Sequence, residues 1–175
     1  VFRSHDGPLT RRQFHDYIDS LGLADNYPAI EGASYAVHVR DSEREAFIAS
    51  VRADRSLAPA GYPGFDIKPP GRRPDYYVLT YIEPMEMLAE KFGTDIGARR
   101  PVSEVLERSR DTGQLGASGQ PIIVNNPTPH IGLGMRMPVY RTGAPLAIVE
   151  DRRRAYLGSV GISFAVPALV HGTLS

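Results

Sequence analysis

The sequence predicts a single α+β domain, with a mainly antiparallel sheet that is flanked by helices and preceded by an N-terminal helix. Two observations predict this class. Capped helical patterns occupy the start and the middle of the chain, whereas three strand-like runs follow one another near its end with no helical pattern between them. The chain has 175 residues, of which 42% are apolar, so it is long enough to bury one core.

The N-terminal helix is predicted over residues 10–21. Thr10 and Gln13 have the spacing of a capping box, in which each side chain bonds the backbone of the other residue. Gly22 supplies the stop. The apolar residues between these signals recur at helical spacing and form one buried stripe: Phe14, Tyr17, Ile18 and Leu21.

Three more helices are predicted from the same kinds of signal. Ser42 and Glu45 form a second capping box before a short helix. Proline suits the first turn of a helix, and glycine suits the position after its last turn. A proline and a glycine bound each of the other two helices, which are 84–92 with Gly93 and 102–111 with Gly113.

Strands are predicted over 33–39, 76–82, 115–124, 131–141 and 157–166. The strand at 76–82 is apolar on both faces, which predicts a central position in the sheet. The segment between the first two strands is rich in proline and glycine, so we expect an ordered loop there. Helices and strands in this order are typical of a PAS-like sensor fold.

The composition excludes several functions. Basic and acidic residues number 20 each, so the net charge predicts no nucleic-acid partner. The chain has no cysteine, which excludes disulfides, thiolate nucleophiles and cysteine-based zinc sites. The histidines lack the spacing of a metal-binding helix, and Gly132 to Arg136 lack the third glycine of a dinucleotide loop. We therefore expect no metal, no cofactor and no catalytic residue.

Charged and apolar runs give two further expectations. Asp111 lies at a predicted helix end, where a hydrogen-bonding role is more typical than catalysis. Arg152, Arg153 and Arg154 predict a solvated face, with anionic lipid headgroups as the alternative partner. No run of 18 apolar residues occurs, so we expect membrane attachment only through segments outside this chain.

An ordered series of short motifs resembles the CHASE domain. Each motif is weak alone, but their order is specific. The resemblance covers about 25–166, which leaves 1–24 as an N-terminal helix and 167–175 as a truncated connector within one domain of residues 1–175. The motifs are PAIEGASYA at 28–36, RDSEREAF at 40–47, YVLTYIEP at 77–84, GTD at 93–95, RSRDTG at 108–113, PVY at 138–140 and LG at 157–158.

CHASE domains are the extracytoplasmic sensors of membrane-anchored receptors, including plant cytokinin-receptor histidine kinases and bacterial histidine kinases and diguanylate cyclases. The resemblance implies a ligand-binding module of PAS-like lobes on a long N-terminal helix, held between two membrane-spanning helices. It implies a periplasmic or extracellular domain that binds a small molecule and belongs to a homodimeric receptor. It also implies that the domain is not an enzyme and that catalytic output lies elsewhere.

The resemblance places a ligand contact at Asp75. Cytokinin receptors hold the adenine ring with an aspartate just before the central strand, and Asp75 stands at the matching position. By strand alternation Asp75 shares one face with Tyr77, Leu79 and Tyr81. The hydrogen-bond acceptor Asp75 then lies at one end of a row of aromatic and aliphatic side chains. The alternative is that Asp75 only caps backbone N–H groups at the strand entrance.

Two more ligand contacts are implied by the resemblance alone. Thr94 stands at the position whose backbone meets the base, and Ser118 stands where the receptors have a pocket threonine.

Three functions remain open from the sequence. The first is a sensor domain that binds a small molecule and shifts a two-state equilibrium. The second is an interaction module that dimerises or docks a protein partner without a small-molecule ligand. The third is a small hydrolase or isomerase, for which the sequence offers no catalytic constellation.

Overall fold

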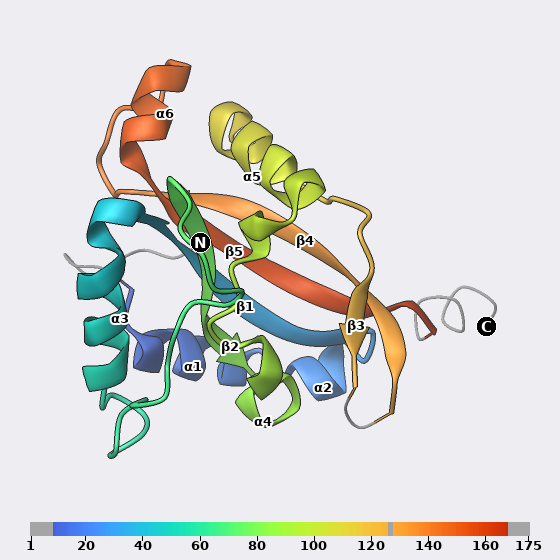
Figure 1. Ribbon diagram of the computed structural model, residues 1–175. Helices are drawn as coiled ribbons and strands as arrows, with labels where there is room; N and C mark the ends of the chain where they lie inside the picture. The colour runs from blue at the N-terminus through green and yellow to red at the C-terminus, as the bar shows by residue number, and fades with distance from the viewer. Residues whose placement is uncertain (1–8, 126–127, 168–175) are drawn as a thin grey trace.

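The computed structural model describes residues 9–125 and 128–167 (Figure 1). Five antiparallel strands form one sheet in the order β2-β1-β5-β4-β3. Helices connect β2 to β3, and this arrangement is PAS-like, so the predicted α+β class is confirmed. The strands are β1 (Ile30–Arg40), β2 (Asp75–Glu83), β3 (Ile122–Val124), β4 (His130–Tyr140) and β5 (Tyr156–Ala165).

Helices cover both faces of the sheet (Figure 1). We call one side the α1 face, because α1 and α3 pack on it, and the other the α5 face, because α4, η3 and α5 pack there. The α-helices are α1 (Arg11–Ser20), α2 (Leu23–Asn26), α3 (Arg44–Ala53), α4 (Met85–Leu88), α5 (Arg100–Thr112) and α6 (Val149–Ala155). The 3-10 helices are η1 (Asp41–Glu43), η2 (Ala89–Lys91) and η3 (Ile96–Ala98).

The N-terminal helix α1 begins as the sequence predicts. The capping box between Thr10 and Gln13 is present, with both reciprocal hydrogen bonds. Phe14 and Ile18 are buried against the α1 face, where they pack with Tyr35. Tyr17 is 39% exposed, so the buried stripe is narrower than predicted.

The start of α3 differs from the prediction. A 3-10 turn, η1, precedes the helix, and the carboxylate of Glu43 accepts the backbone N–H of Arg40 (3.2 Å). The helix itself then begins at Arg44, so the predicted capping box of Ser42 and Glu45 is wrong. The predicted helix is present, and its Ile48 and Val51 are buried against the α1 face.

Strand β2 lies at an edge of the sheet, although the sequence predicts a central strand. Helices cover both of its faces, which explains why both faces are apolar. Its outer edge is paired with an irregular segment, since the N–H of Leu79 donates to the Thr94 carbonyl (2.9 Å) and the N–H of Gly93 donates to the Leu79 carbonyl (2.9 Å). The irregular segment therefore satisfies backbone groups on the outer edge of β2, as a neighbouring strand would.

Asp95 fixes this segment to β2. Its carboxylate is fully buried and accepts the backbone N–H groups of Tyr77 (2.8 Å) and Gly97 (3.0 Å). The guanidinium of Arg73 donates to the other carboxylate oxygen (2.9 Å). Because both oxygens are hydrogen-bonded and the charge is paired, the burial of Asp95 is compensated.

The C-terminal half contains a helix that the sequence analysis missed. Helix α6 lies between β4 and β5, where the prediction had two strands joined without a helix. Its seven residues include a run of charged side chains and no apolar stripe, so periodicity gives no signal for it. The predicted strand at 115–124 is also shorter, because only its last three residues form β3 and Gly116 makes an isolated bridge with Arg136.

Asp111 joins the end of α5 to α6. Its carboxylate accepts hydrogen bonds from Arg153 Nη2 (2.6 Å) and Arg110 Nε (2.7 Å), and its carbonyl accepts one from Arg152 Nε (2.7 Å). The predicted hydrogen-bonding role is confirmed, and two arginines of the basic run bind Asp111 instead of forming a purely solvated face. The hydrogen bonds from Arg153 and Arg110 lower the pKa of Asp111 to about 2.

We expect Asp111 to make the fold sensitive to acid. Its folded-state pKa lies below the unfolded value, so its contribution is present above about pH 4 and is lost as the pH falls toward about 2. We estimate about 1–2 kcal/mol, because the pair with Arg153 is partly exposed to solvent. Urea unfolding between pH 5 and 2 should show a steeper loss for the wild type than for Asp111→Asn. If the unfolding free energies of the two proteins fell equally with pH, Asp111 would not be the cause of the acid sensitivity.

Candidate ligand-binding site

The α5 face has an unusual floor of small residues across its three middle strands. In the paired register these side chains lie in neighbouring rows, and none is larger than serine or alanine. Core-facing positions of a sheet are normally filled by large apolar side chains. The floor residues are Gly32, Ser34 and Ala36 of β1, Ser159, Gly161 and Ser163 of β5, and Gly132 and Gly134 of β4.

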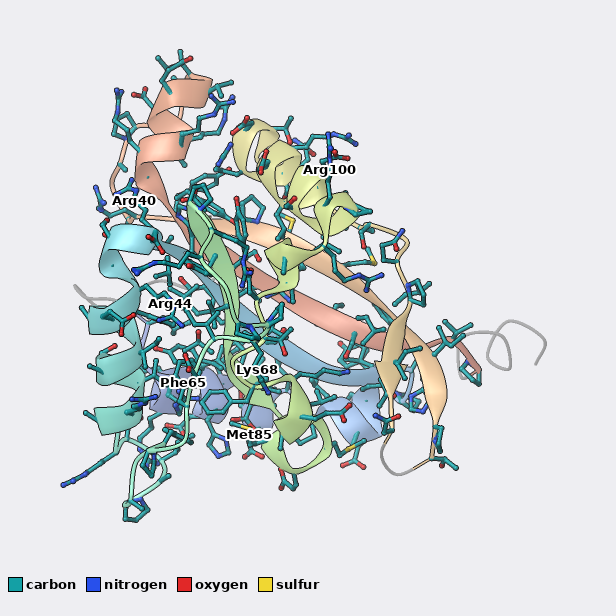
Figure 2. The ribbon with its side chains drawn as sticks, in the orientation of Figure 1. Arg40, Arg44, Phe65, Lys68, Met85 and Arg100 are labelled. Atoms are coloured by element: carbon teal, nitrogen blue, oxygen red, sulfur yellow. The ribbon has the colours of Figure 1, made fainter. Side chains whose placement is uncertain are left out.

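The opposite face of the same strands has the usual large side chains. Tyr35, Val160 and Ile162 lie there and pack in the cluster formed with α1. The contrast between the faces shows that the small residues are a property of one side of the sheet. Figure 1 shows α4 and α5 at the two ends of the α5 face, with the middle of β1, β5 and β4 between them. Met85 on α4 and Arg100 on α5 mark these ends in Figure 2.

Arg136 of β4 lies on this floor. Its Nε donates to the Ser159 hydroxyl (2.8 Å) and its Nη1 donates to the Ser34 hydroxyl (2.9 Å), so the side chain crosses β5 to reach β1. Its Nη2 donates to the Ser34 carbonyl (3.2 Å) and to the Ser159 carbonyl (2.7 Å). A Cβ on Gly161 would lie only 2.6–2.8 Å from the Arg136 side chain, so only glycine permits this path.

All four hydrogen-bond partners of Arg136 are uncharged. Within residues 9–125 and 128–167, no carboxylate lies at ion-pair distance from its guanidinium. Burial lowers the pKa of Arg136 to about 10, so the group still carries its charge at neutral pH. The α5 face therefore holds a cation without a counter-ion.

Apolar side chains surround the floor. Leu79 and Ile82 of β2 form a cluster with Leu88 of α4, and Ile96 packs against it. Leu88 and Ile122 each lie close to a floor glycine, since a Cβ on Gly32 would lie 2.6 Å from Leu88 and one on Gly134 would lie 3.1 Å from Ile122. Ser34, Gly134 and Ser163 between these walls are partly exposed. The arrangement combines apolar walls with a few polar groups, as small-molecule sites do.

A β-bulge in β2 places Tyr81 on the other face from Leu79. Tyr35 pairs with Tyr81 and Ala36 pairs with Leu79, so Thr80 is an extra residue and the alternation reverses there. Tyr81 packs with Phe14 and Tyr35 on the α1 face. The prediction that Tyr81 shares a face with Asp75, Tyr77 and Leu79 is therefore wrong, whereas these other three do share the α5 face.

Asp75 and Tyr77 already have partners within the domain. Asp75 lies at the start of β2 with its side chain 46% exposed, and one of its oxygens is 2.8 Å from Nε2 of His38. Tyr77 is buried and packs with Leu106 of α5 and Tyr156 of β5. A ligand at this end of the face must displace part of that packing to contact Tyr77.

Thr94 and Ser118 lie far from one another across the sheet. Both backbone groups of Thr94 are used, because its N–H donates to the Lys91 carbonyl (3.0 Å) and its carbonyl accepts from Leu79. Ser118 follows Gly116, which pairs with β4, and its hydroxyl accepts the N–H of Gln120 (3.2 Å). Since β2 and β4 are about 14 Å apart, the structure does not bring Ser118 to Asp75.

A second charged group, Glu31, lies at the far end of the same face. Nε2 of His130 contacts its carboxylate, and Nδ1 of the same ring is 2.6 Å from the Thr128 carbonyl oxygen. Both ring nitrogens face acceptors, an arrangement that favours the protonated imidazole. The Thr128 carbonyl and the Glu31 carboxylate raise the pKa of His130 accordingly. Glu31 thus has its own counter-ion and is not the partner of Arg136.

A broad open cleft lies on the α1 side of the sheet. Its volume is about 1360 Å³, and its lining includes Tyr35, Tyr81, Val139 and Val160. Sites that enclose a small molecule usually have volumes of about 300–1,000 Å³. The cleft is therefore too large and open to surround a small ligand, and it resembles an incompletely covered sheet face.

The part of the chain that the structure describes contains neither a metal-binding cluster nor a membrane-spanning helix. No group of three or more histidine, aspartate or glutamate side chains is placed to hold a metal ion. No helix there has the length and apolar character needed to cross a bilayer.

The sequence itself contains a signal for the floor. Small residues occupy every second position in Ser159-Val160-Gly161-Ile162-Ser163 and in Gly132-Leu133-Gly134. In a strand these positions share one face. The alternation in 159–163 and 132–134 therefore indicates a sheet face of small side chains.

Comparison with known proteins agrees with this architecture. A rice protein (Oryza sativa subsp. japonica) described as probable histidine kinase 5 is 27% identical over 156 residues, which is 84% of this chain and 13% of the relative. The chain thus spans a small part of that protein's length. The CHASE domain family model matches residues 8–175. This chain therefore belongs to the CHASE family of extracytoplasmic sensor domains.

Proposed function

We propose that the domain binds a small molecule on the floor of its α5 face and reports that binding to the rest of a membrane-anchored receptor. The observation that carries this proposal is the row of small residues across β1, β5 and β4, where the α5 face lacks the large apolar side chains that the opposite face carries. The partly exposed Ser34, Gly134 and Ser163 support access to this floor.

Strand β5 offers a route for the signal. It contributes three floor residues, Ser159, Gly161 and Ser163, and it ends at Ala165 near the end of the described chain. A ligand on the floor touches this strand directly, so it favours one arrangement of β5 over another by as much as its affinity differs between them. The relative's description as a histidine kinase supports a phosphotransfer output outside this chain; cyclic-dinucleotide synthesis is the alternative.

Filling the floor should abolish ligand binding without unfolding the domain. Ser163→Val adds bulk on the α5 face, and valine is favoured in strands, so we expect a folded domain in which the ligand no longer fits. The measurement is a thermal-shift titration of the wild type and the variant against adenine derivatives and organic acids. Met137→Val on the other face of the adjacent strand is the control. Wild-type binding that survives Ser163→Val would place the ligand elsewhere.

We also propose, from the resemblance to cytokinin receptors, a competing location for the ligand at the Asp75 end of the face. Asp75 pairs with Arg40 in the sheet, six residues along β1 from Ser34. The two ends of the face are thus about 20 Å apart, and one small ligand cannot contact both. The exposed carboxylate of Asp75 supports this location, and its bond with His38 and the packing of Tyr77 oppose it.

The Asp75 location has its own test. Asp75→Ala should weaken the binding of an adenine-type cytokinin by about 1–3 kcal/mol, because ligand donors would be left unpaired. His38→Ala is the matched control, since it removes the internal partner of Asp75 and leaves the carboxylate free for the ligand. Isothermal titration measures both variants. Equal affinity in the wild type and Asp75→Ala excludes a contact at Asp75.

A second candidate function rests on an apolar patch on the α1 face. Ile123, Ile131 and Met137 of β3 and β4 are 54%, 48% and 46% exposed and lie on the same side of the sheet. Uncovered apolar surface of this kind is typical of interaction sites. We propose dimerisation of the receptor through this patch, either beside ligand binding or in place of it.

Dimerisation through this patch should depend on its apolar character. Met137→Glu places a charge in the patch at an exposed position, so it should lower the dimer fraction while the domain stays folded. Sedimentation equilibrium at increasing concentrations measures the change, with Arg100→Glu on the α5 side as the control. A wild-type mass that stays monomeric at all concentrations would contradict self-association of the isolated domain.

A further inference from the structure

Arg136 is partly buried, and it differs from the fully buried charges of Arg11 and Asp95. The guanidinium of Arg11 is paired with Asp54 (2.8 Å), and the carboxylate of Asp95 is paired with Arg73 (2.9 Å). Arg136 has only the hydroxyls and carbonyls of two serines as partners. A buried charge without a counter-ion costs free energy, so a sheet that retains one is poised to accept an anion.

The hydrogen-bond geometry leaves donors for that anion. A guanidinium has five N–H groups, and Arg136 uses four of them, two on Nη2 and one each on Nε and Nη1. The second N–H of Nη1 therefore remains. The Ser34 hydroxyl accepts from Nη1, so its own hydrogen is directed elsewhere, and Ser34 is partly exposed. Together these groups offer two donors and a positive charge at one point of the floor.

The side chains next to Ser34 indicate an apolar body for the ligand. In the sheet, Ser34 pairs with Ile82 of β2, and the next row carries Ala36 and Leu79. Ile96 of η3 packs against this apolar cluster. Glu31, which lies on the same face, is already paired with His130. The site thus combines a cation with apolar walls.

We propose that the sensed molecule is a carboxylate with an apolar body, held by Arg136 and the Ser34 hydroxyl on the floor of the α5 face. This inference rests on the proposed sensor function and assigns its ligand class. It differs from a neutral adenine derivative, which presents donors and acceptors but no negative charge to a guanidinium. The remaining N–H of Nη1 and the Ser34 hydroxyl can each donate to one carboxylate oxygen, and the positive charge favours this class over a compact cation or an uncharged sugar.

The test compares carboxylates with their own amides. Aliphatic and aromatic monocarboxylates of increasing size, from butyrate and benzoate upward, are titrated beside their primary amides and adenine by calorimetry and thermal shift. We expect the best carboxylate to bind at least about tenfold more tightly than its amide, the factor that one charge-assisted hydrogen bond supplies. In Arg136→Gln this preference should disappear.

Three variants distinguish the loss of the Arg136 charge from a loss of folding. Arg136→Gln removes a partly buried charge that has no counter-ion, so the variant should fold, and circular dichroism and the melting temperature verify this. Arg136→Lys keeps the charge and should retain part of the preference. Arg100→Gln is the matched control, because its side chain is on α5 and 89% exposed. It should bind carboxylates as the wild type does.

The outcomes distinguish this inference from the proposed function. Binding of amides or adenine in place of carboxylates would overturn the anionic ligand and leave the sensor function standing. A carboxylate preference that persists in Arg136→Gln would overturn the role of Arg136. Absence of binding by every compound would overturn the inference and would also count against a small-molecule sensor.

Discussion

The arrangement of both faces depends on the β-bulge at Thr80. The extra residue reverses the alternation of β2, so Leu79 faces α4 while Tyr81 faces α1. A bulge also leaves a backbone carbonyl without a ladder partner, and Arg11 supplies one, because its Nη1 donates to the Thr80 carbonyl (2.7 Å) and its Nε binds Asp54. One buried arginine therefore stabilises the bulge and joins α1 to the end of α3.

Pairing with an opposite charge separates the fully buried Arg11 and Asp95 from the partly buried Arg136. Arg11 and Asp95 hold elements together, and each has an opposite charge and backbone partners that are fixed by the fold. Arg136 holds β1, β5 and β4 together through the serines, but its charge is not neutralised by any carboxylate among the described residues. Structural stability alone would favour an uncharged residue there, which is why the cation indicates a binding role.

Local signals predicted the parts of the fold that depend on few residues. The cap at Thr10, the glycine after α5 and the strand patterns are each contained within a short segment, so the sequence was sufficient for them. The bulge at Thr80 and the edge position of β2 arise from pairing with distant segments and give no local pattern. Of the site, the alternation of small residues was visible in the sequence. The bond of Arg136 to Ser34 spans 102 positions and was not.

The uncompensated charge of Arg136 also provides a physical basis for signalling. Without an anion, a second arrangement of β4 and β5 that exposed the guanidinium to water would relieve its desolvation, whereas the arrangement described here keeps it on the floor. An anion that binds only the latter arrangement offsets that cost and favours it. Under the proposed sensor function, the ligand and the unpaired charge would then act on the same equilibrium, and the difference in affinity between the two arrangements would set how far binding shifts it.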